Sequence, residues 1–106
     1  MTKEQKQKQL LVLLRKKMQG VFHVQPYKIM TDETIDNIIA AQPTTYADVK
    51  DVKGFPEGKF RNEMFGRAIA TIIRNYDEID SIELIGNEKD GYNVSIGMKP
   101  SNVFGG

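Results

Sequence analysis

Apolar residues recur with helical spacing in the first fifth of the chain. Leu10, Leu11, Leu13, Leu14 and Met18 form the wide stripe that a helix packs against a core. Before this stripe, Thr2 and Gln5 fit a capping box, in which a hydroxyl and a later amide satisfy free backbone N–H groups. Gly20 follows, and glycine readily adopts the left-handed conformation that ends many helices. The pattern predicts a first helix that stops at Gly20.

The next ten residues depart from this spacing. Val21, Phe22 and Val24 are β-prone, and Pro26 disfavours helical geometry at the residue before it. We therefore expect residues 21–30 to form an extended connector that crosses the mouth of a helical bundle and presents Tyr27.

Two more helices are predicted over residues 31–53. Thr31 or Asp32 caps the first of them, and Pro43 ends it. Thr45 caps the second, about two turns long, where Asp48 also suits the helix dipole. The inward positions are Ile35, Ile38 and Ile39 in the first helix and Val49 and Val52 in the second.

The last third of the chain changes from a helical to a β-type pattern. After a loop over residues 54–58, a long helix is predicted from Lys59, with apolar positions Phe60, Met64, Ala68, Ile72 and Tyr76. Residues 82–85 and 92–96 are β-prone, and residues 86–91 between them suit a hairpin with a long loop. Such a hairpin must pack on the helices or remain loose, and residues 101–106 are expected to be disordered.

These elements predict an all-α fold, a compact bundle of four to five helices with short connections. A C-terminal β-hairpin or a disordered tail accompanies the bundle. The expected organisation is a helical domain over residues 1–78 and a C-terminal extension over residues 79–106.

Composition excludes several classes of chemistry. The 106 residues are 40% hydrophobic and 27% charged, which is typical of one small globular domain. Cysteine is absent and His23 is the single histidine, so thiol chemistry and multi-histidine metal sites are excluded. No acid, base and nucleophile converge in the pattern, which argues against an enzyme and against any cofactor.

Charge is distributed in alternating blocks behind a formal net charge of +1. Residues 1–30 carry +6, residues 31–58 carry −4, residues 59–75 carry +3 and the remainder carries −4. If the two basic blocks meet in the fold, they form a positive face that the net charge conceals. The alternative is that they are ordinary solvated helix faces.

An ordered series of short motifs resembles the HRDC domain, named for helicases and RNase D. The series runs through Leu13-Leu14-Arg15-Lys16, Val24-Gln25-Pro26-Tyr27-Lys28-Ile29, Asp32-Glu33-Thr34-Ile35, Gln42-Pro43-Thr44-Thr45 and Lys53-Gly54-Phe55-Pro56-Glu57-Gly58-Lys59. The Pro-Thr-Thr and Glu-Gly-Lys stretches look most similar to the Werner branch of RecQ-type helicases. The resemblance covers residues 5–76.

The resemblance implies a bundle of about five helices that acts as a non-catalytic accessory module. In some members it contacts single-stranded or structured nucleic acid, and in others it contacts proteins or neighbouring domains. It also implies that Tyr27 lies in the region that touches single strands.

The candidate nucleic-acid contacts combine one aromatic ring with scattered cations: Tyr27, Lys28, Arg15, Lys16, Lys59, Arg61 and Arg67. An exposed Tyr27 would stack on an unpaired base, and Lys28 would meet a phosphate. The alternative is that Tyr27 is buried with its hydroxyl bonded to the backbone. Residues 15–17 cannot all face one strand, because successive residues lie about 100° apart around a helix.

The loop over residues 54–59 allows two interpretations. Its glycines expose backbone N–H groups and Lys59 adds a charge, which together would clamp a phosphate. Glu57 competes for those amides, and a tight turn that needs the glycines for geometry alone is the alternative.

The sequence therefore leaves two functions open. One is a weak, electrostatic module that binds single-stranded or branched DNA for a helicase; the other docks on the helicase core or on a partner protein. We expect an intracellular monomer without membrane contact, in the nucleus of a eukaryote or the cytoplasm and nucleoid of a bacterium. The longest apolar stretch, Leu10 to Leu14, is too short to cross a bilayer.

Overall fold

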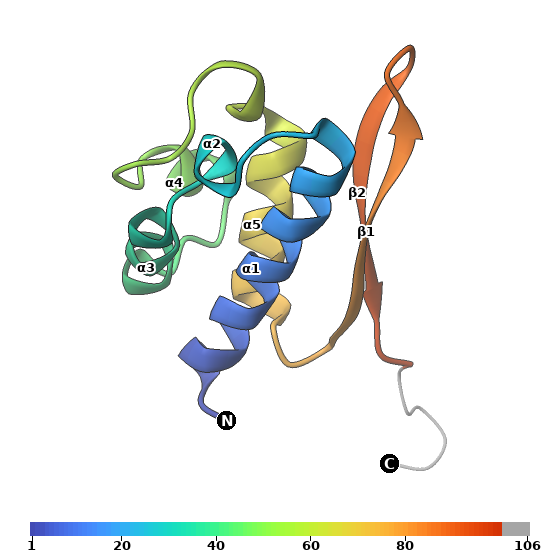
Figure 1. The fold of residues 1–106 in the computed structure, drawn as a ribbon. Coiled ribbons are helices and arrows are strands. Elements are labelled where there is room, and N and C mark those ends of the chain that lie inside the picture. Colours follow the sequence, from blue (N-terminus) through green and yellow to red (C-terminus); the bar gives the residue numbers. More distant parts are fainter. Residues whose placement is uncertain (101–106) are drawn as a thin grey trace.

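Two antiparallel helices form the centre of the molecule, with small helices on one side and a β-hairpin on the other (Figure 1). The computed structural model describes residues 1–100, apart from the side chain of Lys59. The central helices are α1 (Lys3–Phe22) and α5 (Glu63–Asn75). The small helices are α2 (Pro26–Ile29), α3 (Asp32–Ala41) and α4 (Tyr46–Lys50), and a single 3₁₀ turn, η1 (Gly58–Phe60), precedes α5.

Side-chain caps begin the helices at the positions that the sequence indicates. Thr2 and Gln5 form the expected capping box, and the hydroxyls of Thr31 and Thr45 accept N–H groups at the starts of α3 and α4. Each of these caps satisfies a donor that the helix itself leaves unpaired. The predicted caps are confirmed.

The predicted end of the first helix is wrong. Gly20 lies inside α1, which continues to Phe22 and ends at His23 in the left-handed conformation, with φ of 55°. The two additional residues place the Phe22 ring against two others, with its centroid 5.3 Å from that of Phe60 and 5.4 Å from that of Tyr92. Tertiary packing of this ring therefore outweighs the local preference for a glycine stop.

The expected extended connector is also wrong over residues 26–29, which form α2. Gln25 is extended, as the residue before a proline should be, with φ of −68° and ψ of 148°. Pro26 itself occupies the first helical position, where its fixed φ suits the helix and its missing N–H costs nothing.

The last helix starts later than predicted. Lys59 and Phe60 belong to η1, and α5 begins only after Asn62, whose side chain accepts the N–H of Phe65. Phe60 is nevertheless buried, so it is apolar because it packs in the core and not because it belongs to this helix. Tyr46 of α4 lies against Gly66 of α5, where an added Cβ would come within 2.2 Å of the ring.

A β-hairpin follows α5 and packs on the central helices. Its strands, β1 (Ile79–Asn87) and β2 (Gly91–Met98), are antiparallel, with Ile82 opposite Ile96 and Leu84 opposite Val94. The predicted hairpin is confirmed, but its strands are longer and its connection shorter than expected. Ile79 and Ile82 are each 1% exposed and join the helical core, so the fold is mostly helical and not all-α. The disorder predicted for residues 101–106 lies outside the described residues.

One hydrophobic core links the helices and the hairpin. The largest fully buried side chains are Phe65, Leu11, Leu14, Met18, Ile29, Met30, Ile35, Ile38, Ile69, Ile72, Ile79 and Ile82. The buried amide of Gln7 exchanges hydrogen bonds with Gln42, at 3.1 and 2.7 Å, and also donates to the Ile73 carbonyl oxygen. Within residues 1–100, no helix combines the length and apolarity needed to cross a membrane.

Candidate nucleic-acid interface

Tyr27 is presented to solvent by α2. Its side chain is 62% exposed, whereas Ile29 and Met30, just after it, are 1% and 2% exposed and fix the short helix to the core. The Lys28 Nζ atom lies 5.5 Å from the Tyr27 ring centroid. The buried alternative for Tyr27 is therefore wrong, and an aromatic face and a cation stand together at the surface.

Arg15 lies beside this ring but is bound within the protein. Its Nη1 atom donates to the Met30 carbonyl oxygen at 3.2 Å and to Asp32 Oδ1 at 2.7 Å, and its side chain is 15% exposed. Arg15, Pro26, Tyr27 and Asp32 line one shallow hollow. Because Asp32 neutralises its charge, Arg15 positions the chain around α2 and contributes little attraction for a phosphate.

The basic run at residues 15–17 divides among three environments. Lys16 is exposed, whereas the Lys17 ammonium pairs with Glu83 of β1 at 3.0 Å. Arg15 and Lys17 thus pair with acidic residues of two different elements, Asp32 and Glu83. Lys16 remains a candidate phosphate contact.

The second basic block lies elsewhere on the molecule. Arg67 pairs with Glu63 and lines hollows formed with α4 and with β2, neither of which shares a residue with the hollow at Tyr27. Arg61 donates to the Lys50 carbonyl oxygen at 3.3 Å and stands 5.5 Å from the Phe55 ring centroid. The structure thus brings Tyr27, Lys28 and Arg15 together, and does not bring Arg67 to them.

The loop over residues 54–58 is shaped by its glycines. Gly54 and Gly58 have φ values of 88° and 66°, in the region that other residues rarely adopt. The Gly54 carbonyl oxygen accepts the Thr34 hydroxyl at 3.0 Å, which ties the loop to α3. These facts favour the tight turn, while the phosphate clamp depends on the Lys59 side chain, which lies outside the described part.

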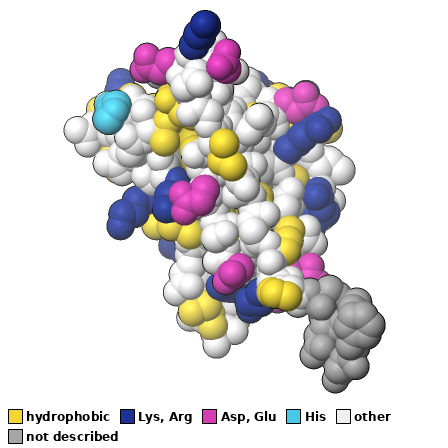
Figure 2. Space-filling model, turned by 90° about the vertical axis from the view of Figure 1, so that its right-hand side faces the viewer, with side chains coloured by type: hydrophobic (Ala, Val, Ile, Leu, Met, Phe, Trp, Pro, Cys, Tyr) yellow, Lys and Arg dark blue, Asp and Glu magenta, His cyan; other side chains and the backbone are white. Residues whose placement is uncertain are grey.

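The hairpin side of the molecule carries no concentration of positive charge. In Figure 2, Lys and Arg side chains are interspersed there with Asp and Glu side chains and with apolar patches. Within residues 1–100, no three His, Asp or Glu side chains are grouped to hold a metal ion.

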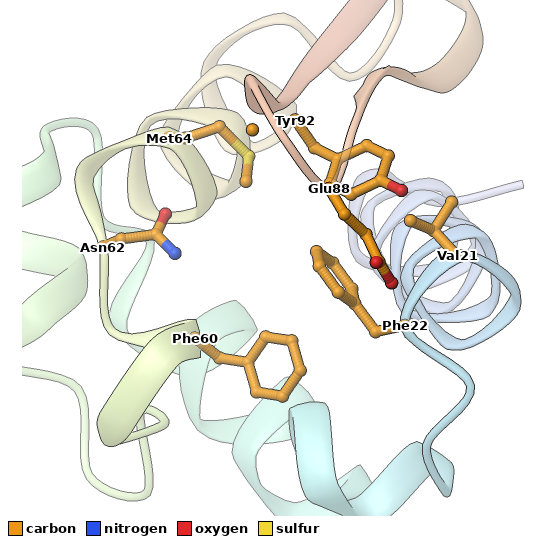
Figure 3. A pocket seen from close by; sticks show the side chains of 8 residues that line it. Val21, Phe22, Phe60, Asn62, Met64, Glu88 and Tyr92 are labelled. Carbon is orange, nitrogen blue, oxygen red and sulfur yellow. The ribbon is translucent and has the colours of Figure 1, made fainter.

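A further hollow is lined in part by Phe22, Phe60, Met64, Glu88 and Tyr92 (Figure 3), and no pattern in the sequence indicates it. Its three aromatic residues come from α1, η1 and β2 and are separated by more than thirty positions each. Only the packing of the hairpin against the helices brings them together, so no local spacing could have predicted the site.

The residues that the structure describes form five helices and a two-stranded antiparallel hairpin around one hydrophobic core. The sequence profile of the HRDC domain family matches residues 8–73, more than half of the chain, and the chain belongs to that family. HRDC domains are non-catalytic accessory modules of helicases and nucleases. Searches of curated proteins and of solved structures gave no significant match.

Proposed function

We propose that this domain is the accessory module of a RecQ-type DNA helicase of the Werner-like branch, and that it binds single-stranded or branched DNA weakly. The proposed parent follows from the ordered motifs between Leu13 and Lys59, above all the Pro-Thr-Thr and Glu-Gly-Lys stretches. The proposed ligand follows from the surface at α2.

The observation that carries the proposal is the exposure of Tyr27. A ring that is 62% exposed has a free face on which an unpaired base can stack. Lys28 stands beside it and supplies a positive charge for the adjoining phosphate. Stacking on one ring is tolerant of sequence, so we expect little discrimination among bases.

The charge near α2 makes the binding weak. Asp32 pairs with Arg15 and Glu63 pairs with Arg67, so the candidate cations with described side chains and no carboxylate partner in residues 1–100 are Lys16, Lys28 and Arg61. With so few phosphate contacts, we expect micromolar or weaker affinity that falls steeply with salt.

The test is the binding of fluorescently labelled oligothymidylate, followed by anisotropy at low salt and then at rising salt. Tyr27→Ala should lower the affinity about tenfold, because stacking on an aromatic ring contributes roughly 1–3 kcal/mol per base. Tyr27→Phe should retain the affinity, since the ring and its face remain.

Lys28→Ala should reduce the salt dependence, with the slope of log K against log salt becoming shallower by about 0.7. Lys3→Ala is the matched control, because Lys3 is an exposed lysine in the first turn of α1, at the end far from α2 (Figure 1). Wild-type protein that does not bind at low salt, or equal losses for Lys28→Ala and Lys3→Ala, would refute the proposal.

The competing function is docking on the helicase core or a partner protein. Ile85 on β1 and Met98 on β2 are 60% and 42% exposed, so the hairpin presents two large apolar side chains to solvent. The acidic block over residues 31–58 adds a negative surface. Absence of DNA binding at low salt, together with binding of the isolated helicase core, would favour docking.

A further inference from the structure

The hollow between the C-terminal end of α1, the start of α5 and the tip of the hairpin has the features of a cation-binding site. In Figure 3, the Phe22, Phe60 and Tyr92 rings bound it on one side and below, and the Met64 thioether faces them from α5. The hollow has a volume of about 480 Å³, which accommodates a long side chain. It shares no lining residue with the hollow at Tyr27.

The Phe22 ring is nearly perpendicular to the other two rings. Phe22 meets Phe60 at 79° and Tyr92 at 75°, with centroid separations of 5.3 and 5.4 Å. Perpendicular rings form adjoining walls of a box, and the face of each ring carries the negative part of its quadrupole. The Tyr92 face can therefore attract a cation that enters the hollow.

Glu88 adds a formal negative charge at the mouth of this hollow. It lies in the turn between β1 and β2, and its carboxylate points toward the Phe22 ring in Figure 3. The Glu88 carboxylate has no ion pair or hydrogen bond with residues 1–100, so its charge is not neutralised within the described chain. An unpaired carboxylate repels phosphate groups and attracts a cationic ligand.

We propose that this hollow binds an arginine side chain of a partner polypeptide. A guanidinium group is planar, stacks on aromatic faces and pairs with a carboxylate in a bidentate manner, and Tyr92 and Glu88 offer both partners together. The aliphatic stem of arginine would lie against Val21 and Met64. This site is independent of the DNA-binding surface proposed at α2.

The test uses two capped tripeptides, Gly-Arg-Gly and Gly-citrulline-Gly, titrated into the isotope-labelled chain and followed by NMR. Citrulline has the shape of arginine without its charge, so only the arginine peptide should bind. The shifts should concentrate on residues 21, 64, 88 and 91–92, and the arginine methylene protons should move upfield because of the ring currents.

Glu88→Gln keeps the shape of the side chain and removes its charge. It should lower the affinity for the arginine peptide about threefold or more. Asp90→Asn is the matched control, because Asp90 is an exposed acid in the same turn that does not line the hollow, and it should change the affinity less than twofold by the same reasoning. Binding of the arginine peptide that is lost with Glu88→Gln and kept with Asp90→Asn supports the proposal.

Any of three results with the peptides would overturn it: equal binding of the citrulline peptide, equal weakening by Glu88→Gln and Asp90→Asn, or no shift at the lining residues with the arginine peptide. A stronger response of the same residues to deoxyadenosine monophosphate would also overturn it, because the hollow would then be a pocket for a nucleobase. None of these results depends on whether Tyr27 binds DNA.

Discussion

The two aromatic surfaces of this domain differ in how much support each ring receives. At α2, Tyr27 is 62% exposed and its ring centroid lies 5.5 Å from the Lys28 Nζ atom. At the hairpin, Phe22 lies half-buried between Phe60 and Tyr92, next to the unpaired Glu88 carboxylate. If both proposals hold, the charge beside each ring decides the ligand more than the exposure of the ring does: Lys28 favours an anionic strand at Tyr27, and Glu88 favours a cation at the hairpin.

The largest expected contrast is in stability. Phe22→Ala removes the ring that joins α1 to the hairpin and should lower the free energy of unfolding by about 3 kcal/mol. Tyr27→Ala removes a ring that is mostly in water and should change it by less than about 0.5 kcal/mol. Urea denaturation of both variants measures the difference, and similar losses would contradict the division into a structural ring and a free one.

Two glycine substitutions test the backbone conformation, one in the loop that contacts α3 and one inside α1. Gly54→Ala should destabilise the fold by about 2 kcal/mol, because φ is 88° and the new Cβ would lie 2.6 Å from Thr34 Oγ1. Gly20→Ala should stabilise the fold by about 0.5–1 kcal/mol, because Gly20 lies inside α1 and a new Cβ there would meet no atom within 4 Å. Thermal unfolding gives both signs, and a stabilised Gly54→Ala variant would contradict the strained loop.

Arg15 and Lys28 should separate a structural cation from a binding one. Arg15→Ala breaks the hydrogen bonds to Met30 and Asp32 and should cost about 1 kcal/mol of stability. Its effect on oligothymidylate affinity should be smaller than that of Lys28→Ala, which should leave stability unchanged. The reverse order in the anisotropy titration would mean that Arg15 is the main phosphate contact.

The smallest expected effect is that of Glu88→Gln on DNA affinity. Glu88→Gln should change the affinity for oligothymidylate by less than about twofold, because the carboxylate is at a separate surface from Tyr27 and salt screens charges beyond about 10 Å. The anisotropy assay at moderate salt is the measurement. A clear gain in DNA affinity would place the hollow on the path of the strand.

Local interactions made much of the fold predictable. The hydroxyls of Thr2, Thr31 and Thr45 cap helices within three residues of themselves, so the sequence contains the whole interaction. The end of α1 was predicted wrongly because Phe22 packs against rings 38 and 70 positions further along. Local preference for a glycine stop contains no information about such distant partners.

The candidate site was predictable in the same partial way. Pro26 and Tyr27 indicate an aromatic residue on the segment after the first helix, but they leave open whether its ring is exposed or buried. The pairing of Arg15 with Asp32, 17 positions away, removes a cation that composition alone counts as available. The aromatic hollow combines three distant segments and needed the structure.

The burial of Ile79 and Ile82 determines how this domain can be cut for expression. The family match ends at residue 73, yet both isoleucines are 1% exposed and belong to the core shared with α1 and α5. A fragment that ends at residue 73 would expose hydrophobic surface on both central helices, and we expect it to aggregate. Recombinant fragments should therefore retain the strands through Met98.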